Sequence, residues 1–227
     1  MKELLKSLLF KTGLLRLWNR HLAGNRLRTQ GARNRIRIGK SLLTRSAILI
    51  RGNGNSVNIG DGCRFRDLKI ILTGDSLQVD ISDHCQLRGK IKAEDAGSRV
   101  EIGAGTTMEN AYVGAYEGAF VRIGKDCMFS DQVGVRTGDM HSIVDAQTGA
   151  RQNPARSIVI ESRVWLCRGA TVLKGCTIGA DTVVGGNALV TESLPAGVLA
   201  VGAPAKVVRT GIRWRRDRIA ADPSGNA

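Results

Sequence analysis

Isoleucine recurs along this chain at a spacing that belongs to neither an α-helix nor a hairpin sheet. Ile38, Ile59, Ile81, Ile102 and Ile123 follow one another at intervals of 21, 22, 21 and 21 residues. Apolar and polar positions alternate before each isoleucine, and glycine follows four of the five. Because a fixed period of about 20 residues or more is typical of solenoids, we predict coils stacked along an axis.

The spacing tightens to six residues beyond position 158. Three such hexads make a coil of 18 residues, in which each short strand ends at a corner. The pattern predicts a mainly β protein, a parallel β-solenoid. The apolar positions at this interval are Ile160, Leu166, Val172, Ile178, Val184 and Val190.

Small side chains occupy the position four residues after the repeated isoleucine. They are Cys63, Cys85, Thr106 and Cys127. In stacked coils these residues become neighbours about 4.8 Å apart, and we expect them to be small core residues. The chain has five cysteines without a C-x-x-C spacing, so the pattern indicates neither a disulfide framework nor a zinc site.

The patterns divide the chain into three parts. Residues 1–35 comprise an amphipathic helix (1–22) and a basic polar linker. The coils occupy 36–207 and are interrupted by a loop at 145–157. We expect the tail, 208–227, to begin as a basic helix.

Positive charge is concentrated near the N-terminus. Residues 1–51 hold 13 Lys/Arg and one acid, which accounts for +12 of the net charge of +14. The apolar positions of 1–22 fall at helical spacing, and Trp18 is the one aromatic suited to base stacking. The segment therefore favours contact with an anionic inner-membrane surface over nucleic acid, with capping of the solenoid edge as the alternative. No apolar run is long enough to span a bilayer and no cleavage site follows, so we expect a cytoplasmic protein.

Three motifs carry a resemblance to a known family. They are the segment VWLCRGATVLKGCTIGADTVVGGNALVTESLPAGVLAVGAPAKVVR at 164–209, the motif DMHSI at 139–143, and the loop ending in RQNP. Together they resemble the hexapeptide-repeat acyltransferases, and among these the bacterial polysaccharide and sialic-acid-type O-acetyltransferases. The resemblance covers about residues 36–209. It implies a left-handed parallel β-helix, a homotrimer, acetyl-CoA as co-substrate, a carbohydrate acceptor and no metal.

His141 is the candidate general base. By the 21-residue step it falls on the place of Phe120, just before the chain leaves the solenoid in a loop. The resemblance assigns this histidine the removal of a proton from a sugar hydroxyl, a role that suits a neutral imidazole. His21 ends the basic helix and His84 lies at a corner position, so we expect neither to be catalytic.

A general base of this kind needs a partner that orients its other ring nitrogen. Asp139 and Asp145 flank His141, and Asp126 and Asp131 lie one coil earlier. The sequence does not decide among these carboxylates, and Asp139 is the first choice. Its alternative role is to cap the turn.

Trp165 is expected to point outward from the solenoid because its neighbour Leu166 already holds the core position. The resemblance places this tryptophan at the acetyl site. Its N–H could donate to the developing oxyanion, or its ring could shield the thioester from water. An ordinary apolar residue on the side of the coil is the alternative.

The resemblance also implies a site for coenzyme A along the C-terminal coils. Lys206 and Arg209 would meet its phosphates, whereas Arg136 and Arg151 flank His141 and could bind a carboxylate or phosphate on the acceptor. Solvent exposure is the alternative for the two arginines that flank His141, and corner formation is the alternative for the small residues. The small residues expected to line the pantetheine arm are Gly169, Ala170, Gly186, Asn187, Ala188, Ala203 and Pro204.

These observations predict an acetyl-CoA-dependent O-acetyltransferase that acts on a bacterial surface polysaccharide (capsule, O-antigen or exopolysaccharide) or its lipid-linked precursor. The alternative acceptor is a nucleotide sugar or a small xenobiotic, acetylated on nitrogen or oxygen. A non-enzymatic scaffold is disfavoured, because it needs neither a base nor an outward tryptophan. A γ-type carbonic anhydrase is excluded, because His21, His84 and His141 lack the required zinc-ligand spacing.

Overall fold

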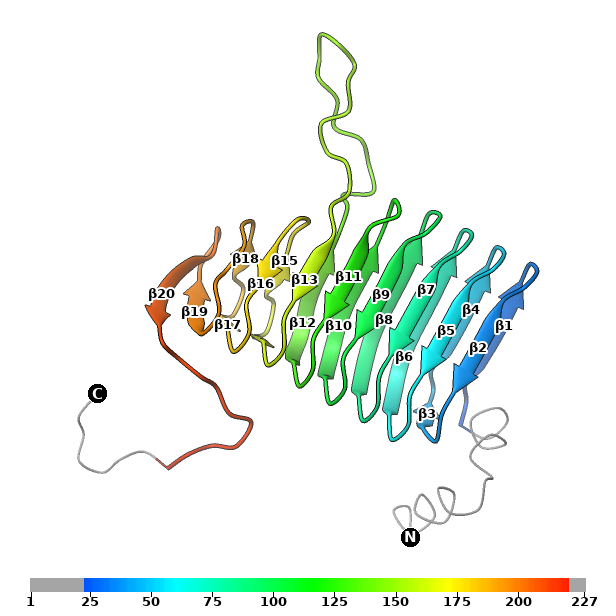
Figure 1. Cartoon of the computed structure of the whole chain (residues 1–227), viewed down its shortest axis with the longest axis horizontal. Coiled ribbons are helices and arrows are strands. Elements are labelled where there is room, and N and C mark those ends of the chain that lie inside the picture. The colour runs from blue at the N-terminus through cyan, green and yellow to red at the C-terminus, as the bar shows by residue number, and fades with distance from the viewer. Residues whose placement is uncertain (1–22, 221–227) are drawn as a thin grey trace.

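The structure is a computed structural model that describes residues 23–220. Those residues form a parallel β-solenoid and contain no α-helix (Figure 1). No helix in this part of the chain has the length and apolar character needed to cross a membrane. The amphipathic helix expected at 1–22 lies outside the described residues.

Two sheets build the walls of the solenoid, and every strand pair except β19–β20 is parallel. The first sheet has 13 strands: β1 (Arg26–Gln30), β3 (Leu42–Thr44), β4 (Ala47–Arg51), β6 (Arg64–Thr73), β8 (Gln86–Glu94), β10 (Thr107–Ala115), β12 (Met128–Arg136), β14 (Trp165–Leu166), β15 (Thr171–Val172), β17 (Val183–Val184), β18 (Leu189–Val190), β19 (Val198–Val201) and β20 (Lys206–Thr210). The second sheet has seven: β2 (Arg35–Ile38), β5 (Ser56–Ile59), β7 (Gln78–Ile81), β9 (Arg99–Ile102), β11 (Phe120–Ile123), β13 (Ile158–Ile160) and β16 (Thr177–Ile178).

The repeated isoleucines stack in register along the axis, as their spacing predicts. Ile59 pairs with Ile81, Ile102 follows in the next coil, and the ladder continues through Ile123 to Ile160. Each of these side chains is at most 4% exposed. Since full burial of one such side chain contributes about 1.5–3 kcal/mol, this continuous ladder is a principal source of stability.

The cysteine ladder is part of the core, as predicted. Cys63, Cys85 and Cys127 are fully buried, and so is Thr106 between them. Each side chain lies next to a backbone carbonyl of the following coil, as in the 3.1 Å contact between Cys127 Sγ and Glu161 O. Burial raises the pKa of the Cys127 thiol to about 11, so at neutral pH this thiol is protonated and inert.

Corners of the coils adopt the left-handed backbone conformation. His84 has φ of 59°, Gly62 and Gly105 have 68° and 73°, and Asp126 has 55°. A Cβ atom on Gly62 would lie only 2.3 Å from His84 Nδ1, so the exposed imidazole covers the glycine of the preceding coil. His84 is therefore a surface corner residue, as its place in the repeat predicts.

Both ends of the described chain differ from the sequence expectation. β1 lies within the segment expected to be a linker, and it pairs with β4 over five residues. At the other end the expected C-terminal helix is wrong for 208–220: β20 runs antiparallel to β19, and the chain then continues without helix. Gly211 (φ 68°) redirects the backbone, and Trp214 then packs against the solenoid at 7% exposure. These tertiary contacts outweigh helical propensity.

Candidate active site

An arm made of residues 138–156 projects from the solenoid between β12 and β13 (Figure 1). Its two sides pair with each other: Val144 and Arg151 form an antiparallel bridge, and Gln152 N donates to Ile143 O at 2.7 Å. At the base, Arg156 N donates to Thr137 O at 2.9 Å. The excursion expected from the sequence is therefore an ordered hairpin.

His141 lies near the base of the arm, and its side chain is exposed. Its backbone carbonyl accepts a hydrogen bond of 2.8 Å from Asn153 Nδ2. The imidazole forms no hydrogen bond or ion pair within residues 23–220. Both ring nitrogens are thus open to partners from outside this part of the chain.

Asn153 holds the two sides of the arm together, and sequence reasoning missed it. The residue is 6% exposed. Its side-chain oxygen accepts from Ile143 N at 2.7 Å, while its Nδ2 donates to Asp139 Oδ2 and to His141 O, both at 2.8 Å. Both polar atoms of the side-chain amide are therefore hydrogen-bonded, and the bond to His141 O fixes the backbone of His141. The RQNP motif contains this asparagine but does not reveal its partners.

The carboxylate of Asp139, which we expected to orient His141, contacts Lys174 and Asn153 instead. Asp139 Oδ2 accepts hydrogen bonds from Lys174 Nζ and from Asn153. The ammonium of Lys174 and the amide of Asn153 lower the pKa of Asp139. The structure gives no hydrogen bond between Asp139 and His141, so within one chain this carboxylate orders the arm.

Of the other candidate carboxylates, two have structural partners and the third lies at a corner. Asp145 accepts from Thr148 N at 2.8 Å and from Gln147 N at 3.0 Å, and these amides lower its pKa and close the tip of the arm. Asp131 accepts from Asn110 Nδ2 at 3.0 Å. Asp126 occupies a corner with positive φ. None of these carboxylates is hydrogen-bonded to His141 within the described chain.

Trp165 points outward, as predicted. In β14 its neighbour Leu166 is fully buried, whereas Trp165 is half-buried. Its Nε1 donates to Ser130 Oγ at 3.3 Å, and its ring lies 5.9 Å from that of Trp214 between centroids. Trp214, from the C-terminal tail, also donates from Nε1 to Arg163 O at 2.5 Å. The tail thus forms one wall beside Trp165, a contact that no local pattern indicates.

A single chain does not bring His141 and Trp165 together. Trp165 pairs with Met128, the first residue of β12. His141 follows Arg136, the last residue of the same strand, by five positions. Trp165 therefore lies beside the first residue of β12, whereas His141 lies beyond its last.

The small residues expected along the pantetheine arm form corners. The amides of Gly169, Ala170, Asn187 and Ala188 all donate to backbone carbonyls, at 2.9–3.2 Å. A Cβ on Gly169 would lie 2.1 Å from Asn187 Oδ1 and would displace that side chain, and the φ of 73° also favours glycine there. Within the chain, these four amides have partners, which favours the corner interpretation.

The remaining candidates for coenzyme A lie near the C-terminal end of the solenoid. Lys206 and Arg209 are exposed on β20, opposite Val201 and Leu199. Gly186 faces open space apart from a carbonyl at 3.5 Å from an added Cβ. Ala203 and Pro204 connect β19 to β20 through a cis peptide bond.

The two arginines expected to bind the acceptor have different surroundings. Arg151 makes two hydrogen bonds with the carboxylate of Glu117, at 2.6 and 3.0 Å, and this guanidinium lowers the pKa of Glu117. Arg151 therefore ties the arm to the solenoid. Arg136 lies over the ring of Tyr112, 4.9 Å from its centroid, and keeps an exposed guanidinium.

Comparison with known proteins identifies the family, although no family model matches the chain. A polysialic acid O-acetyltransferase of Neisseria meningitidis is 36% identical over 147 residues, which cover 64% of this chain and 68% of that relative. The crystal structure of the polysialic acid O-acetyltransferase OatWY superposes with a TM-score of 0.82 at 32% identity, over 87% of this chain and 95% of that one. The structure of the polySia-specific acetyltransferase NeuO gives 0.81 at 30% identity, over 89% and 94%. The solenoid, its outward tryptophan and its histidine-bearing arm thus belong to a left-handed β-helix acyltransferase, a member of the hexapeptide-repeat family of bacterial polysaccharide O-acetyltransferases.

Proposed function

We propose that the protein transfers an acetyl group from acetyl-CoA to a sugar hydroxyl of a bacterial surface polysaccharide, with His141 as general base. The observation that carries this proposal is the similarity to polysialic acid O-acetyltransferases over nearly their whole length, 95% of OatWY. The exposed His141 on an ordered arm fits the chemistry that this activity requires.

In the proposed reaction, the neutral imidazole of His141 takes the proton of the acceptor hydroxyl as its oxygen attacks the thioester carbonyl. Trp165 Nε1 lies on the outer surface, where it donates to Ser130 Oγ at 3.3 Å; in the reaction it exchanges this acceptor for the oxyanion that develops on that carbonyl. The carbon–sulfur bond then breaks, and the imidazolium returns the proton to the departing thiolate. Lys206 and Arg209 bind the phosphates of coenzyme A at the C-terminal end of the solenoid.

The active form is proposed to be a homotrimer, in which the arm of one subunit reaches Trp165 of the next. Two observations support this. Trp165 lies beside the first residue of β12 and His141 beyond its last, so one chain has an incomplete site. The arm also exposes Met140 (50%), Ile143 (61%) and Val144 (52%), which a neighbouring subunit would cover. A carboxylate from that subunit would be free to orient His141.

The test is a direct assay of acetyl transfer. Purified protein is incubated with acetyl-CoA and polysialic acid, release of free thiol is followed, and the product is examined by mass spectrometry for O-acetyl groups. His141→Ala is the negative control. Absence of transfer to polysialic acid and to other bacterial capsule or O-antigen polysaccharides, with transfer only to nucleotide sugars or small amines, would contradict the proposal.

The basic N-terminus bears on where this reaction occurs. We propose a cytoplasmic enzyme whose residues 1–22 attach reversibly to the anionic inner-membrane surface, because each cation near such a surface contributes about 1 kcal/mol. Deletion of residues 2–22 should leave a stable trimer that is active on soluble acceptors and no longer sediments with vesicles of anionic phospholipid. If deletion causes aggregation, the segment caps the solenoid edge instead.

A further inference from the structure

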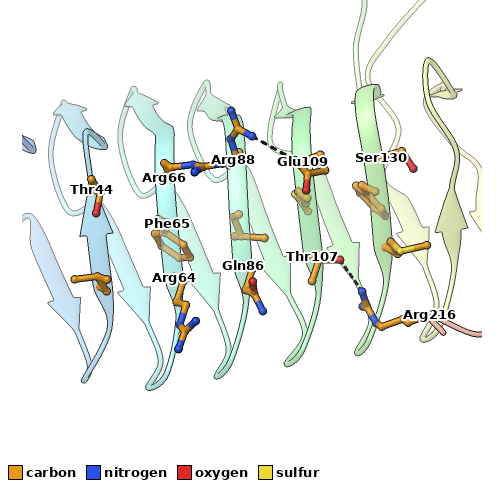
Figure 2. A pocket seen from close by; sticks show the side chains of 15 residues that line it. Thr44, Arg64, Phe65, Arg66, Gln86, Arg88, Thr107, Glu109, Ser130 and Arg216 are labelled. Atoms are coloured by element: carbon orange, nitrogen blue, oxygen red, sulfur yellow. Dashed lines mark hydrogen bonds and ion pairs between the residues drawn. The ribbon is translucent and has the colours of Figure 1, made fainter. Parts of the chain in front are cut away.

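A groove of about 600 Å³ runs along the outside of the coils that precede the arm. Its floor is formed by the first residues of β6, β8, β10 and β12, in adjacent coils. Figure 2 shows Arg64 and Arg66 on β6 to either side of Phe65, which points into the core and is 2% exposed. The exposed side chains of these strands therefore line the groove together with the inward side chains between them, such as Phe65 and Phe129, which are almost fully buried.

The groove is rich in guanidinium groups. Its lining includes Arg64, Arg66, Arg88 and Arg216, and a single carboxylate, that of Glu109. Arg64 and Arg66 are exposed and form no ion pair within the described residues. The lining therefore carries a net positive charge, although the surrounding coils contain many acids.

Those acids are held at the corners. Asp61 Oδ1 accepts from Lys40 N at 2.6 Å, and Asp83 Oδ1 accepts from Asp61 N at 2.7 Å in the next coil. In the same way, Asp75 Oδ1 accepts a hydrogen bond from Asn53 N at 2.6 Å. These three carboxylates accept from corner amides, and Asp67 on β6 pairs with Arg45 at 2.8 Å, so Arg64 and Arg66 keep their charge.

Arg88 has a donor that no group within residues 23–220 satisfies. Its Nη1 contacts Glu109 Oε2 at 3.3 Å (Figure 2). Its Nε, by contrast, is the one buried side-chain nitrogen or oxygen among residues 23–220 without a hydrogen-bond partner. Buried polar groups are almost always paired, so the protein satisfies the Arg88 guanidinium only in part, and its exposed end remains on the groove.

The C-terminal tail closes the groove toward Trp165. Arg216 donates to Thr107 Oγ1 at 2.9 Å (Figure 2). It also donates to Cys127 O at 3.0 Å, and because both acceptors are neutral, its charge is not cancelled. Ser130 lines the groove and also receives the hydrogen bond of Trp165 Nε1. The groove is therefore continuous with the surface beside Trp165.

From these observations we infer that the groove binds a segment of acidic polysaccharide and leads its hydroxyl toward Trp165. The inference rests on the proposed function and specifies the acceptor as an anionic polymer. Adjacent coils lie about 4.8 Å apart, so guanidinium groups on neighbouring strands meet successive carboxylates and hydroxyls of an extended chain. The groove offers arginines and amides but no outward aromatic ring, because Phe65 and Phe129 are buried, and so it suits charge recognition and not stacking on neutral sugars.

The decisive variant is Arg64→Gln/Arg66→Gln, compared with Arg35→Gln/Arg37→Gln. The control removes the same two charges from exposed positions of β2, on the other sheet. Loss of two charge-assisted contacts should raise the KM for polysialic acid about ten-fold or more and reduce its dependence on salt, while the KM for acetyl-CoA and the melting temperature stay unchanged. Binding of the polymer without acetyl-CoA should weaken by the same factor.

Three outcomes would overturn the inference: an unchanged acceptor KM, an equal change in the β2 control, or a rise in the KM for acetyl-CoA, which would place coenzyme A in the groove. Carboxyl-reduced polysialic acid provides a second measurement, and it should bind the wild-type protein as weakly as the polymer binds the Arg64/Arg66 variant. If wild-type protein transfers no acetyl group to any polysaccharide, the proposed function fails. Selective loss of polymer binding in that variant would still support the groove.

Discussion

The coils before the arm and those after it share one core but differ in their walls. Before the arm the period is 21 or 22 residues, and the strands of the first sheet reach ten residues, as in β6. After it the period is 18, and β14 to β18 have two residues each. Figure 1 shows the longer strands of the N-terminal coils beside the shorter coils that follow. The isoleucine ladder nevertheless continues from Ile123 to Ile160 without interruption.

This difference suggests a division of labour along the axis. The coils before the arm, which we call the wide half, have long outward faces that carry the guanidinium groups of the groove. The coils after the arm, which we call the tight half, present small residues and corners, with Lys206 and Arg209 near their end. We propose that the acidic polymer binds along the N-terminal coils and acetyl-CoA along the C-terminal coils. The arm with His141 emerges where the two halves meet, so the four predictions below test that arrangement.

Loss of the proposed general base should have the largest effect, because the reaction proposed for both halves depends on it. His141→Ala should lower kcat about 10²–10⁴-fold and leave folding unchanged, since the side chain is exposed. The matched control is His84→Asn, at an exposed corner with positive φ that asparagine tolerates. Turnover of His141→Ala above about a tenth of the wild-type rate would rule out general-base catalysis by this residue.

Trp165, at the beginning of the tight half, should have the next largest effect. Trp165→Ala should reduce kcat about 10²-fold, because it removes a donor beside the acetyl group. Trp165→Phe keeps a ring against Trp214 but lacks the N–H, so it separates hydrogen bonding from packing. A large fall in melting temperature, with normal turnover of the folded fraction, would show instead that Trp165 is only a packing residue.

The donor half is tested by Lys206→Ala/Arg209→Ala. Removal of these exposed cations should raise the KM for acetyl-CoA about ten-fold and leave the acceptor KM unchanged, the reverse of the Arg64/Arg66 result. Arg215→Ala is the control, because that tail arginine is paired with Asp217. Equal KM values for wild type and the double variant would remove both residues from the donor site.

The smallest effect concerns the pH dependence of the arm at the junction. Lys174 lowers the pKa of Asp139 below its usual 3.8, and Arg151 lowers that of Glu117. A lowered pKa in the folded state means that the stabilisation is present above the unfolded pKa and is lost as the pH falls through the folded value. Hydrogen exchange at the Ile143 amide should therefore accelerate below about pH 4 relative to amides of β9 and β11.

Asp139→Asn is the matched variant for this measurement. Its amide oxygen can still accept from Asn153, but it does not titrate, so the acid-induced acceleration at Ile143 should become a few-fold smaller. An unchanged pH profile in this variant would show that Asp139 does not control the order of the arm.

Features that belong to the sequence repeat could be predicted from the sequence. The pairing of Ile81 with Ile102, the burial of Cys85 and the corner at His84 all follow from residue spacing. The outward direction of Trp165 follows from the same rule, because Leu166 takes the inward position. In each case the interaction joins equivalent positions of successive coils, so the period itself specifies the contact.

Other features depend on residues that no period relates. Asn153 joins Asp139 and His141 across the arm, and Lys174 reaches the same carboxylate from 35 residues away in the sequence. Arg151, expected to bind acceptor, pairs with Glu117 over 34 residues. Such long-range polar pairs depend on the exact path of the chain, which composition and spacing do not encode.

The sequence by itself determined a β-solenoid with an internal ladder, a change of coil size near residue 158, and an excursion beside His141, because each is a matter of local periodicity and its interruption. Tertiary structure decided which charges remain unpaired. Corner amides donate hydrogen bonds to the carboxylates of Asp61 and Asp83, and the tail positions Arg216 against neighbouring coils. Arginines that look like ordinary solvated residues in the sequence thereby become the lining of one groove, because stacking places distant positions side by side.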